Sequence, residues 1–234
     1  MVHRPWSAPN MRFIVFNLES QIQNYWCSVA ENLRERQAGG RLEEEPVLRE
    51  KLILASKSPR RAEILSAVGW PFETIAANID ETQGESEDAV SYVKRLAQTK
   101  AEAVAKRLSS GLVLGADTTV LVDGSILGQP RDFEDAGRML RLLGGKWHEV
   151  LTGVALVCAG SNRFVVDHET TRVRLGEMSE VEIDWYIATG EPMDKAGAYA
   201  VQGKAALFIE EIQGDYFNIV GLPIRLVYKL AQRI

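Results

Sequence analysis

The sequence has few cysteines, few histidines and no long apolar run, and each shortage excludes a class of protein. Only Cys27 and Cys158 are cysteines among 234 residues, and they form neither a disulfide framework nor a metal or redox motif. Two isolated thiols are typical of a reducing compartment, so we expect a cytoplasmic protein. The three histidines have no partners at metal-ligand spacing. No apolar run approaches the roughly 18 residues that span a bilayer, so we expect no membrane partner.

The chain also lacks an excess of positive charge. Its formal net charge is −5 and its isoelectric point is about 5.4. A nucleic-acid-binding surface usually needs a basic balance, so we expect no nucleic-acid partner. The Gly-x-x-x-x-Gly-Lys-Ser/Thr motif and the protein-kinase motifs are missing as well. With 46% hydrophobic residues, the chain can still bury a substantial core.

The first 46 residues differ in composition from the rest. Residues 32–46 are polar and charged and include Gly39-Gly40 and the run Glu43 to Pro46, which is typical of a solvated linker. We expect residues 1–46 to be an extension that is either disordered or the product of a misassigned start site, with translation beginning at Val47. The folded domain is then expected over residues 47–234.

Strand and helix patterns alternate along this domain, which predicts one α/β domain with two lobes around a cleft. A capping box of Ser179 and Glu182 predicts a helix that ends before Gly190. The other predicted helices span residues 59–68, 90–108, 133–143 and 223–232. Strands are predicted at 52–55, 72–76, 112–122 (or a hairpin turning at 123–124), 150–157, 163–175 and 206–212.

The segment Leu52 to Arg61 has the features of a phosphate-binding turn. An apolar strand is followed by two serines, with Ser58 as the expected N-cap and Pro59 at the first helical position. Free N–H groups at a helix start favour anions, and the guanidinium groups of Arg60 and Arg61 suit phosphate oxygens. The alternative is a capped helix whose arginines face solvent. The pattern alone leaves both open.

Two charged residues stand where apolar ones are expected. Asp117 interrupts the apolar strand 112–122, where a carboxylate needs a charged partner or a cation. Lys100 falls on the apolar face of the helix 90–108, so its ammonium either extends to the edge or points into a site. Glu81 offers a second carboxylate, although it can equally be a loop acid. Phosphates beside carboxylates repel one another unless a divalent cation lies between them, so we expect Mg²⁺ or Mn²⁺.

Five motifs in this order resemble those of the Maf family of nucleoside triphosphate pyrophosphatases. They are Ser56–Arg61, Gly115–Thr118, Glu191–Tyr199, Gln202-Gly203 and Val220–Pro223. The resemblance covers about Leu52 to the C-terminus. It implies a fold similar to that of the inosine triphosphate pyrophosphatases, with a mixed twisted sheet. It also implies hydrolysis between the α and β phosphates, which yields a monophosphate and pyrophosphate, and a homodimer is common among such relatives.

The same resemblance implies roles for single residues. Ser-Pro-Arg-Arg, Gly-Ala-Asp-Thr and Gln-Gly are typical of the subgroup that resembles dTTP/UTP pyrophosphatases. Asp117 is then the acid–base residue that activates water. The residues expected to set base choice are Arg60, Thr118 and Gln202. Phosphate contacts are expected from Ser56, Arg61, Lys100 and Lys195, and the metal from Glu81 and Asp117.

One departure and two alternatives accompany this resemblance. Many members have lysine where this chain has Gln129, so we expect one phosphate contact to be weaker or to come from Arg131. A first alternative function is a 7-methyl-GTP or broad noncanonical-nucleotide pyrophosphatase. A second is a nucleotide-binding regulator of cell division, which needs the anion site but no catalytic water.

Overall fold

The computed structural model describes residues 52–234, and the expected extension over residues 1–46 lies outside them. The strands are β1 (Leu52–Leu54), β2 (Phe72–Thr74), β3 (Leu112–Val122), β4 (Ser125–Leu127), β5 (Trp147–Cys158), β6 (Phe164–Leu175) and β7 (Ile209–Gln213). The α-helices are α2 (Pro59–Ala67), α3 (Ala89–Ala105), α4 (Phe133–Leu143), α5 (Glu180–Ala188), α6 (Tyr216–Val220) and α7 (Ile224–Ala231). Three short 3₁₀ helices follow α5, namely η1 (Glu191–Asp194), η2 (Ala196–Ala198) and η3 (Lys204–Phe208).

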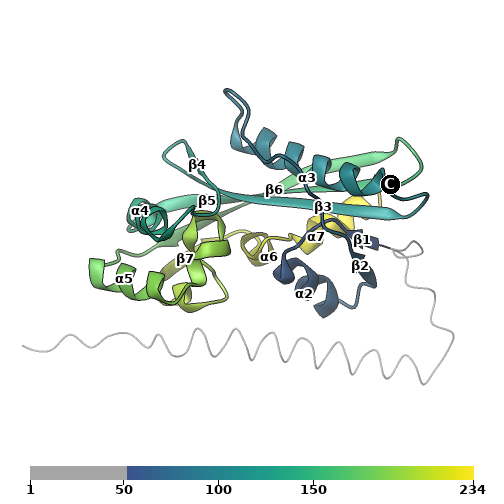
Figure 1. The fold of residues 1–234 in the computed structure, drawn as a ribbon. Helices are drawn as coiled ribbons and strands as arrows, with labels where there is room; N and C mark the ends of the chain where they lie inside the picture. The colour runs from purple at the N-terminus through teal and green to yellow at the C-terminus, as the bar shows by residue number, and fades with distance from the viewer. Residues whose placement is uncertain (1–51) are drawn as a thin grey trace, which may run out of the picture. The chain divides into compact units, whose positions relative to one another are not determined.

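The seven strands of residues 52–234 join one mixed sheet, which confirms the predicted α/β architecture. The order is β2-β1-β3-β5-β6-β7, with β4 paired to β3 outside this path. Strand β1 runs parallel to both β2 and β3, whereas β3, β5, β6 and β7 pair antiparallel. The long strands β3, β5 and β6 cross the middle of the molecule in Figure 1.

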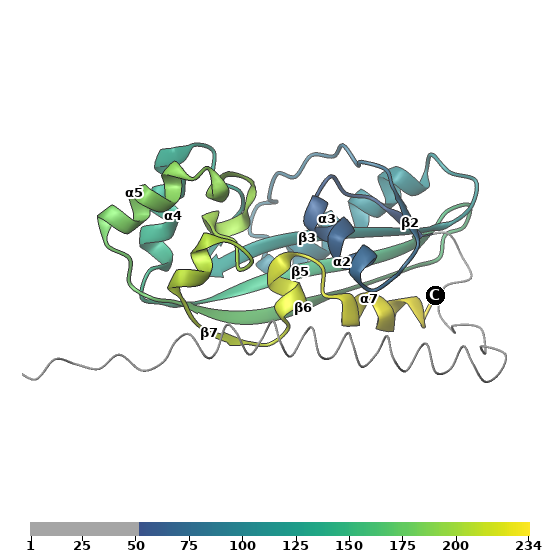
Figure 2. The same cartoon turned by 90° about the horizontal axis from the view of Figure 1, so that it is seen from below.

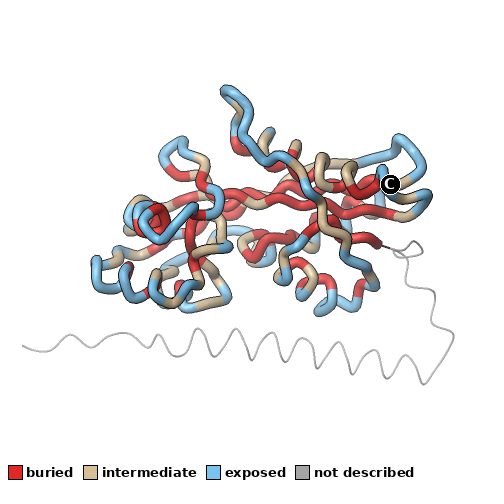
Figure 3. Tube along the Cα trace, in the orientation of Figure 1, coloured by how far each residue is buried: buried red, intermediate tan, exposed pale blue. Residues whose placement is uncertain are grey.

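The two faces of the sheet carry different cores. On one face, Ile53, Val113 and Ala155 pack with buried residues of α3. On the other face, two separate clusters form. One joins α2 and α7 to β1, β3 and β5, and the other joins α4 and α5 to further residues of β3, β5 and β6. Figure 3 shows the sheet as the most continuously buried part.

Two glycines allow α3 to lie directly on the sheet. A Cβ at Gly115 would lie 2.1 Å from the carbonyl oxygen of Ala97, and one at Gly153 would lie 2.2 Å from that of Val93. Both distances are shorter than any real Cβ contact, so only glycine fits at either position. Because Gly153 is the β5 partner of Asp117, this close approach brings the helix against the strand at the predicted catalytic residue.

Strand β3 has an open stretch of edge between two neighbours. Its pairing with β1 ends at Leu114, where the backbone N–H of Ala55 makes the last bond, and its pairing with β4 begins at Val120. Three of the residues between them, Asp117, Thr118 and Thr119, line the cavity of the domain. Figure 2 shows the same arrangement from below, with α4 and α5 at one end and α2 and α7 at the other.

Several predicted elements differ from the structure, most of all around residues 204–220. The strand predicted at 206–212 is wrong in its first half, because Lys204–Phe208 forms η3 and the strand spans Ile209–Gln213. Helix α6 was not predicted, since five residues are too short for a helical repeat. Strand β2 ends at Thr74 and helix α3 at Ala105, both earlier than expected. The capping box of Ser179 and Glu182 is confirmed.

Candidate active site

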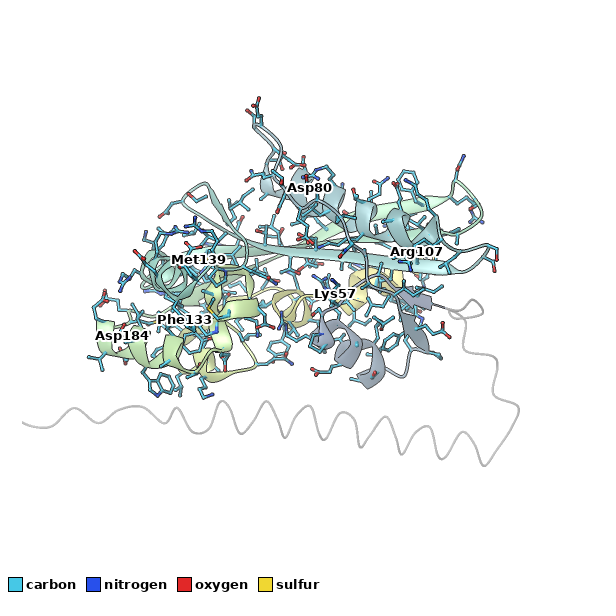
Figure 4. The ribbon with its side chains drawn as sticks, viewed as in Figure 1. Lys57, Asp80, Arg107, Phe133, Met139 and Asp184 are labelled. Atoms are coloured by element: carbon cyan, nitrogen blue, oxygen red, sulfur yellow. The ribbon has the colours of Figure 1, made fainter. Side chains whose placement is uncertain are left out.

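A cavity of about 900 Å³ opens beside the free edge of β3. Lys57, labelled near the middle of Figure 4, is one of the residues that line it. All nine residues predicted from the sequence contribute to its wall, although they come from segments up to 146 positions apart (56 to 202). They are Ser56, Arg60, Arg61, Glu81, Lys100, Asp117, Thr118, Lys195 and Gln202.

Asp117 lies on the α3 face of the sheet and forms an ion pair with Lys100. The Lys100 ammonium donates to Oδ1 of Asp117 at 2.6 Å and lies 2.9 Å from Oε1 of Glu81. The side chains of Asp117 and Lys100 are 9% and 12% exposed, whereas that of Glu81 is 55% exposed. Of the two orientations left open for Lys100, the structure has the one that points into the site.

The surroundings of Asp117 act on its pKa in opposite directions. Burial raises the pKa of Asp117 above its usual value, because a carboxylate loses hydration there. The charge and hydrogen bond of Lys100, and then the charge of Arg61, lower it again, but burial is the larger effect. A buried carboxyl with a raised pKa is suited to accept a proton.

Arg61 is buried on the opposite face of the sheet and donates to three different segments. Its Nε donates to the carbonyl of Gly221 at 2.8 Å, its Nη1 to Oγ of Ser56 at 3.1 Å, and its Nη2 to Oγ1 of Thr118 at 3.2 Å. Burial lowers the pKa of the guanidinium, and the nearby Asp117 carboxylate partly opposes that effect. A guanidinium carries five N–H bonds, so two remain for a ligand after these three contacts.

The turn before α2 differs in one detail from the predicted helix cap. Ser58 does occupy the N-cap position, but its side chain makes no capping hydrogen bond. Instead, the hydroxyl of Ser56 accepts from the backbone N–H of Ser58 at 3.1 Å. Ser56 therefore organises the turn, and the first N–H groups of α2 remain available, as an anion site requires.

The second wall of the cavity comes from η1, and Asp194 is at its centre. Arg60 donates twice to this residue, from Nη1 to Oδ2 at 2.9 Å and from Nη2 to the carbonyl at 3.2 Å. Lys195 pairs with the same carboxylate, and Gln129 donates to the same carbonyl at 3.2 Å. Arg131, the expected substitute for a lysine at 129, bonds to Asp135 instead and does not line the cavity.

Gln202 projects from a turn that Glu191 holds in place. Oε1 of Glu191 accepts from the hydroxyl of Tyr186 at 2.8 Å, and Oε2 accepts from the backbone N–H of Lys204 at 3.1 Å. A Cβ at Gly203 would lie 2.2 Å from the Glu191 carboxylate, so a larger residue there would displace that carboxylate from its present contacts. The resemblance identified Glu191–Tyr199 and Gln202-Gly203 as motifs, but nothing in their pattern identified Asp194 and Glu191 as the residues that organise this segment.

The donor set fits a small hard cation only in part. Glu81 and Asp117 supply two carboxylates to the cavity, and Mg²⁺ commonly takes one or two carboxylates with the rest from substrate phosphates and water. Within residues 52–234, no cluster of three or more His, Cys, Asp or Glu side chains could hold a metal alone. The chemistry of the two carboxylates therefore suits a cation that arrives with a phosphorylated ligand.

The fold and the cavity together define an α/β protein whose cavity has a buried guanidinium on one face of the sheet and a buried carboxylate on the other. The chain belongs to the Maf family, because the family model described as Maf-like protein matches residues 51–234. This confirms the family expected from the five motifs.

Curated relatives at about half identity cover nearly the same segment. The dTTP/UTP pyrophosphatase of Bacillus cytotoxicus is 51% identical over 183 residues, which are 78% of this chain and 95% of the relative. The dTTP/UTP pyrophosphatase of Symbiobacterium thermophilum is 50% identical over 184 residues, or 78% and 94% of the two chains. The Ham1 protein of Staphylococcus aureus has a solved structure with a TM-score of 0.48 and 15% identity, over 79% of this chain and 99% of that one.

Proposed function

We propose that this protein is a nucleoside triphosphate pyrophosphatase that hydrolyses dTTP and UTP to the monophosphate and pyrophosphate. The observation that carries this proposal is the position of Asp117, buried in the same cavity as Arg61 and paired with Lys100. The names of the relatives at about 50% identity support the choice of substrate. Modified pyrimidine triphosphates are further candidates, since they share the base edge and the triphosphate.

In the proposed reaction, one water molecule cleaves one phosphoanhydride bond. Asp117 accepts the proton of the attacking water, and Lys100 holds the carboxylate through its hydrogen bond at 2.6 Å. Arg61, Lys100 and Lys195 stabilise the negative charge that develops on the leaving pyrophosphate. Cations that are held in place before the ligand binds, as Arg61 and Lys100 are, stabilise such charge with little reorganisation, which is often the largest contribution to the rate.

A divalent cation, Mg²⁺ or Mn²⁺, belongs to this proposal. Glu81 and Asp117 are the residues that would hold it, together with oxygens of the substrate. When bound, it would supply charge neutralisation at the phosphates and a lower pKa for a coordinated water.

The proposal includes the surroundings of the enzyme. Two isolated cysteines support a cytoplasmic location. No helix among residues 52–234 is long and apolar enough to cross a membrane. The acidic isoelectric point favours a free nucleotide over a nucleic acid as partner. We also include a homodimer, on resemblance alone, which analytical ultracentrifugation would test.

Incubation of the purified protein with Mg²⁺ and dTTP, UTP, CTP, ATP, GTP or 7-methyl-GTP tests the proposal directly. We expect pyrophosphate, and no orthophosphate, from dTTP and UTP. If pyrophosphate formed only from a nucleotide with another base, the proposed reaction would stand and the proposed specificity would be contradicted. No turnover with Mg²⁺ or Mn²⁺, by protein that still binds nucleotides, would favour the binding regulator instead.

Base choice has its own test at Gln202. A site that hydrogen-bonds a base discriminates strongly, because a wrong base leaves polar groups unpaired. Gln202→Glu removes the amide donor and adds a negative charge at an exposed position of the cavity wall. We expect the preference for UTP over GTP to fall, and an unchanged ratio of the two kcat/KM values would contradict the role of Gln202.

A further inference from the structure

A buried threonine and a partly buried one lie side by side where the two core clusters of one sheet face meet. Thr118 on β3 and Thr152 on β5 are direct cross-strand partners. The residues on the same face before and after them, Ala116 and Val120, belong to the first and the second cluster respectively. Thr152 is fully buried, so each polar atom of its side chain needs a partner inside the protein. The hydroxyl pair is therefore a polar junction between two apolar regions.

The direction of the hydrogen bonds at this junction follows from the available protons. The hydroxyl of Thr152 lies 3.1 Å from the backbone carbonyl of Asn218, which can only accept, so Thr152 donates its single proton there. The 3.0 Å contact between the two threonine hydroxyls must then use the proton of Thr118. Arg61 in turn donates to Thr118. The chain runs in one direction, from Arg61 through Thr118 and Thr152 to the carbonyl of Asn218.

The far end of this chain is fixed by further contacts. The Asn218 side chain is fully buried, and its Nδ2 donates to the carbonyl of Val150 at 2.8 Å and to Oγ1 of Thr171 at 3.0 Å. Asn218 belongs to α6, and the C-cap of that helix is Gly221, whose carbonyl also accepts from Arg61. The short helix α6 therefore holds the guanidinium twice, once directly and once through the two threonines.

The chain also decides what the two hydroxyls beside Arg61 can offer to a ligand. Ser56 already accepts from Arg61 and from the N–H of Ser58, so its proton is what remains. Thr118 has given its proton to Thr152, so only an acceptor position remains. Phosphate oxygens only accept at these contacts, hence Ser56 can bind one and Thr118 cannot.

We propose that Thr152 is a positioning residue of the anion site, which acts on Arg61 through Thr118. This inference rests on the proposed function for its meaning in catalysis, but its geometry concerns the binding of a phosphate-containing anion. Without the Thr152 hydroxyl, the Thr118 proton loses its acceptor and can turn toward the guanidinium. Arg61 then loses a fixed acceptor on one side and is no longer held in a single orientation.

A double-mutant cycle tests this proposal, with inorganic pyrophosphate in Mg²⁺ as the probe and its Kd measured by calorimetry. We expect Thr152→Val to weaken pyrophosphate about tenfold, the size of one hydrogen bond to a charged group. Thr118→Val should weaken it to a similar extent, and the double variant should be no worse than about tenfold, because both changes break one chain. Thr152→Ser, which keeps the hydroxyl, should stay within about twofold of the wild type.

Three results would overturn the proposal: wild-type affinity in Thr152→Val, equal damage in Thr152→Ser, or a double variant weakened about a hundredfold. Thr119→Val is the matched control, because it removes a buried threonine hydroxyl that donates to the carbonyl of Leu127 and takes no part in the hydrogen bonds from Arg61 to Asn218. It should lower the melting temperature without changing the Kd. If Thr152→Val does not fold, Thr152→Ala replaces it, since alanine removes the hydroxyl without adding a methyl beside the Asn218 carbonyl.

The same measurements separate this proposal from the proposed function. A wild-type protein that binds pyrophosphate but hydrolyses no nucleotide would contradict the pyrophosphatase function and leave the coupling of Thr118 and Thr152 intact. If the protein hydrolyses dTTP but the effects of the two threonine substitutions on the Kd add, the pyrophosphatase function would stand and the coupling of Thr118 and Thr152 would be contradicted.

Discussion

The two walls of the cavity place cations by different means. On the α2 wall, Arg61 is 9% exposed and is held by neutral acceptors from three separate segments. At the η1 wall, the carboxylate of Asp194 is 60% exposed and is shared by Lys195 and by Arg60, which reaches it from α2. The side chains of Lys195 and Arg60 are 15% and 24% exposed. Buried hydrogen bonds fix a group before the ligand arrives, whereas an ion pair to a solvent-exposed carboxylate is screened by water and exchanges more readily. We infer that the α2 wall is preorganised and the η1 wall adaptable.

Asp117 belongs to neither wall. Its substitution is expected to have the largest effect on turnover, with which the effects of substitutions in the two walls can be compared. Asp117→Asn keeps the shape of the side chain and removes the base, so we expect kcat for dTTP to fall at least about a hundredfold, the low end for general acid–base catalysis. The circular dichroism spectrum should not change. Near-normal turnover by a folded variant would remove Asp117 from the mechanism.

A buried histidine behind the η1 wall is expected to make the folded state less stable in acid. His148 is 2% exposed and its Nε2 lies 2.8 Å from the hydroxyl of Tyr199, which directly follows η2. Burial lowers the pKa of His148 from 6.5 to about 4. As the pH falls, the unfolded chain takes up this proton near pH 6.5, whereas the folded chain takes it up only near pH 4. The free energy of unfolding therefore decreases as the pH falls from 6.5 to 4, and the histidine has little effect on it above pH 6.5.

We expect this histidine to lower the free energy of unfolding by about 2–3 kcal/mol between pH 6.5 and 4.5. His148→Gln removes the titration and can keep a donor toward Tyr199. Urea unfolding of both proteins across this range isolates the effect, because carboxylates titrate alike in the two. Parallel pH profiles would exclude His148 as the acid-sensitive group.

Matched substitutions of the two neighbouring α2 arginines compare contacts within the α2 wall, made by Arg61, with contacts to the η1 wall, made by Arg60. Lysine keeps the charge but cannot reproduce three N–H contacts in a plane, so Arg61→Lys should lower kcat/KM for dTTP about tenfold or more. Arg60→Lys should lower it only about threefold, because Asp194 can pair with an ammonium as well. Equal losses from the two variants would mean that the walls do not differ in preorganisation.

The smallest effect is expected from the shared carboxylate. Asp194→Asn keeps an acceptor for Arg60 but removes the negative charge that competes with substrate phosphates for two cations. We expect KM for dTTP to fall two- to threefold at low salt and the difference to shrink as salt screens the pair. A rise in KM would instead identify Asp194 as the residue that positions Arg60 and Lys195.

Local patterns were sufficient for most elements and for the position of the site. Three predicted features depend only on residues that are near one another in the sequence. They are the capping box of α5, the apolar stripe of α3 and the strand–turn–helix around Ser56. The patterns failed at η3 and α6, whose conformations are decided by contacts with distant strands, such as the Asn218 side chain on the Val150 carbonyl.

The sequence by itself determined the family and the α/β class, because motifs and periodicity are properties of short segments. The resemblance to that family then proposed the residues of the site. The sequence even marked Lys100 and Asp117 as out of place among apolar neighbours. Only the tertiary structure decided which of them touch. Asp117 and Thr118 are adjacent in the chain, yet alternation along β3 sends one side chain to α3 and the other to Arg61. Partners more than 130 positions away, such as Asp194 for Arg60, are set by packing that no local pattern contains.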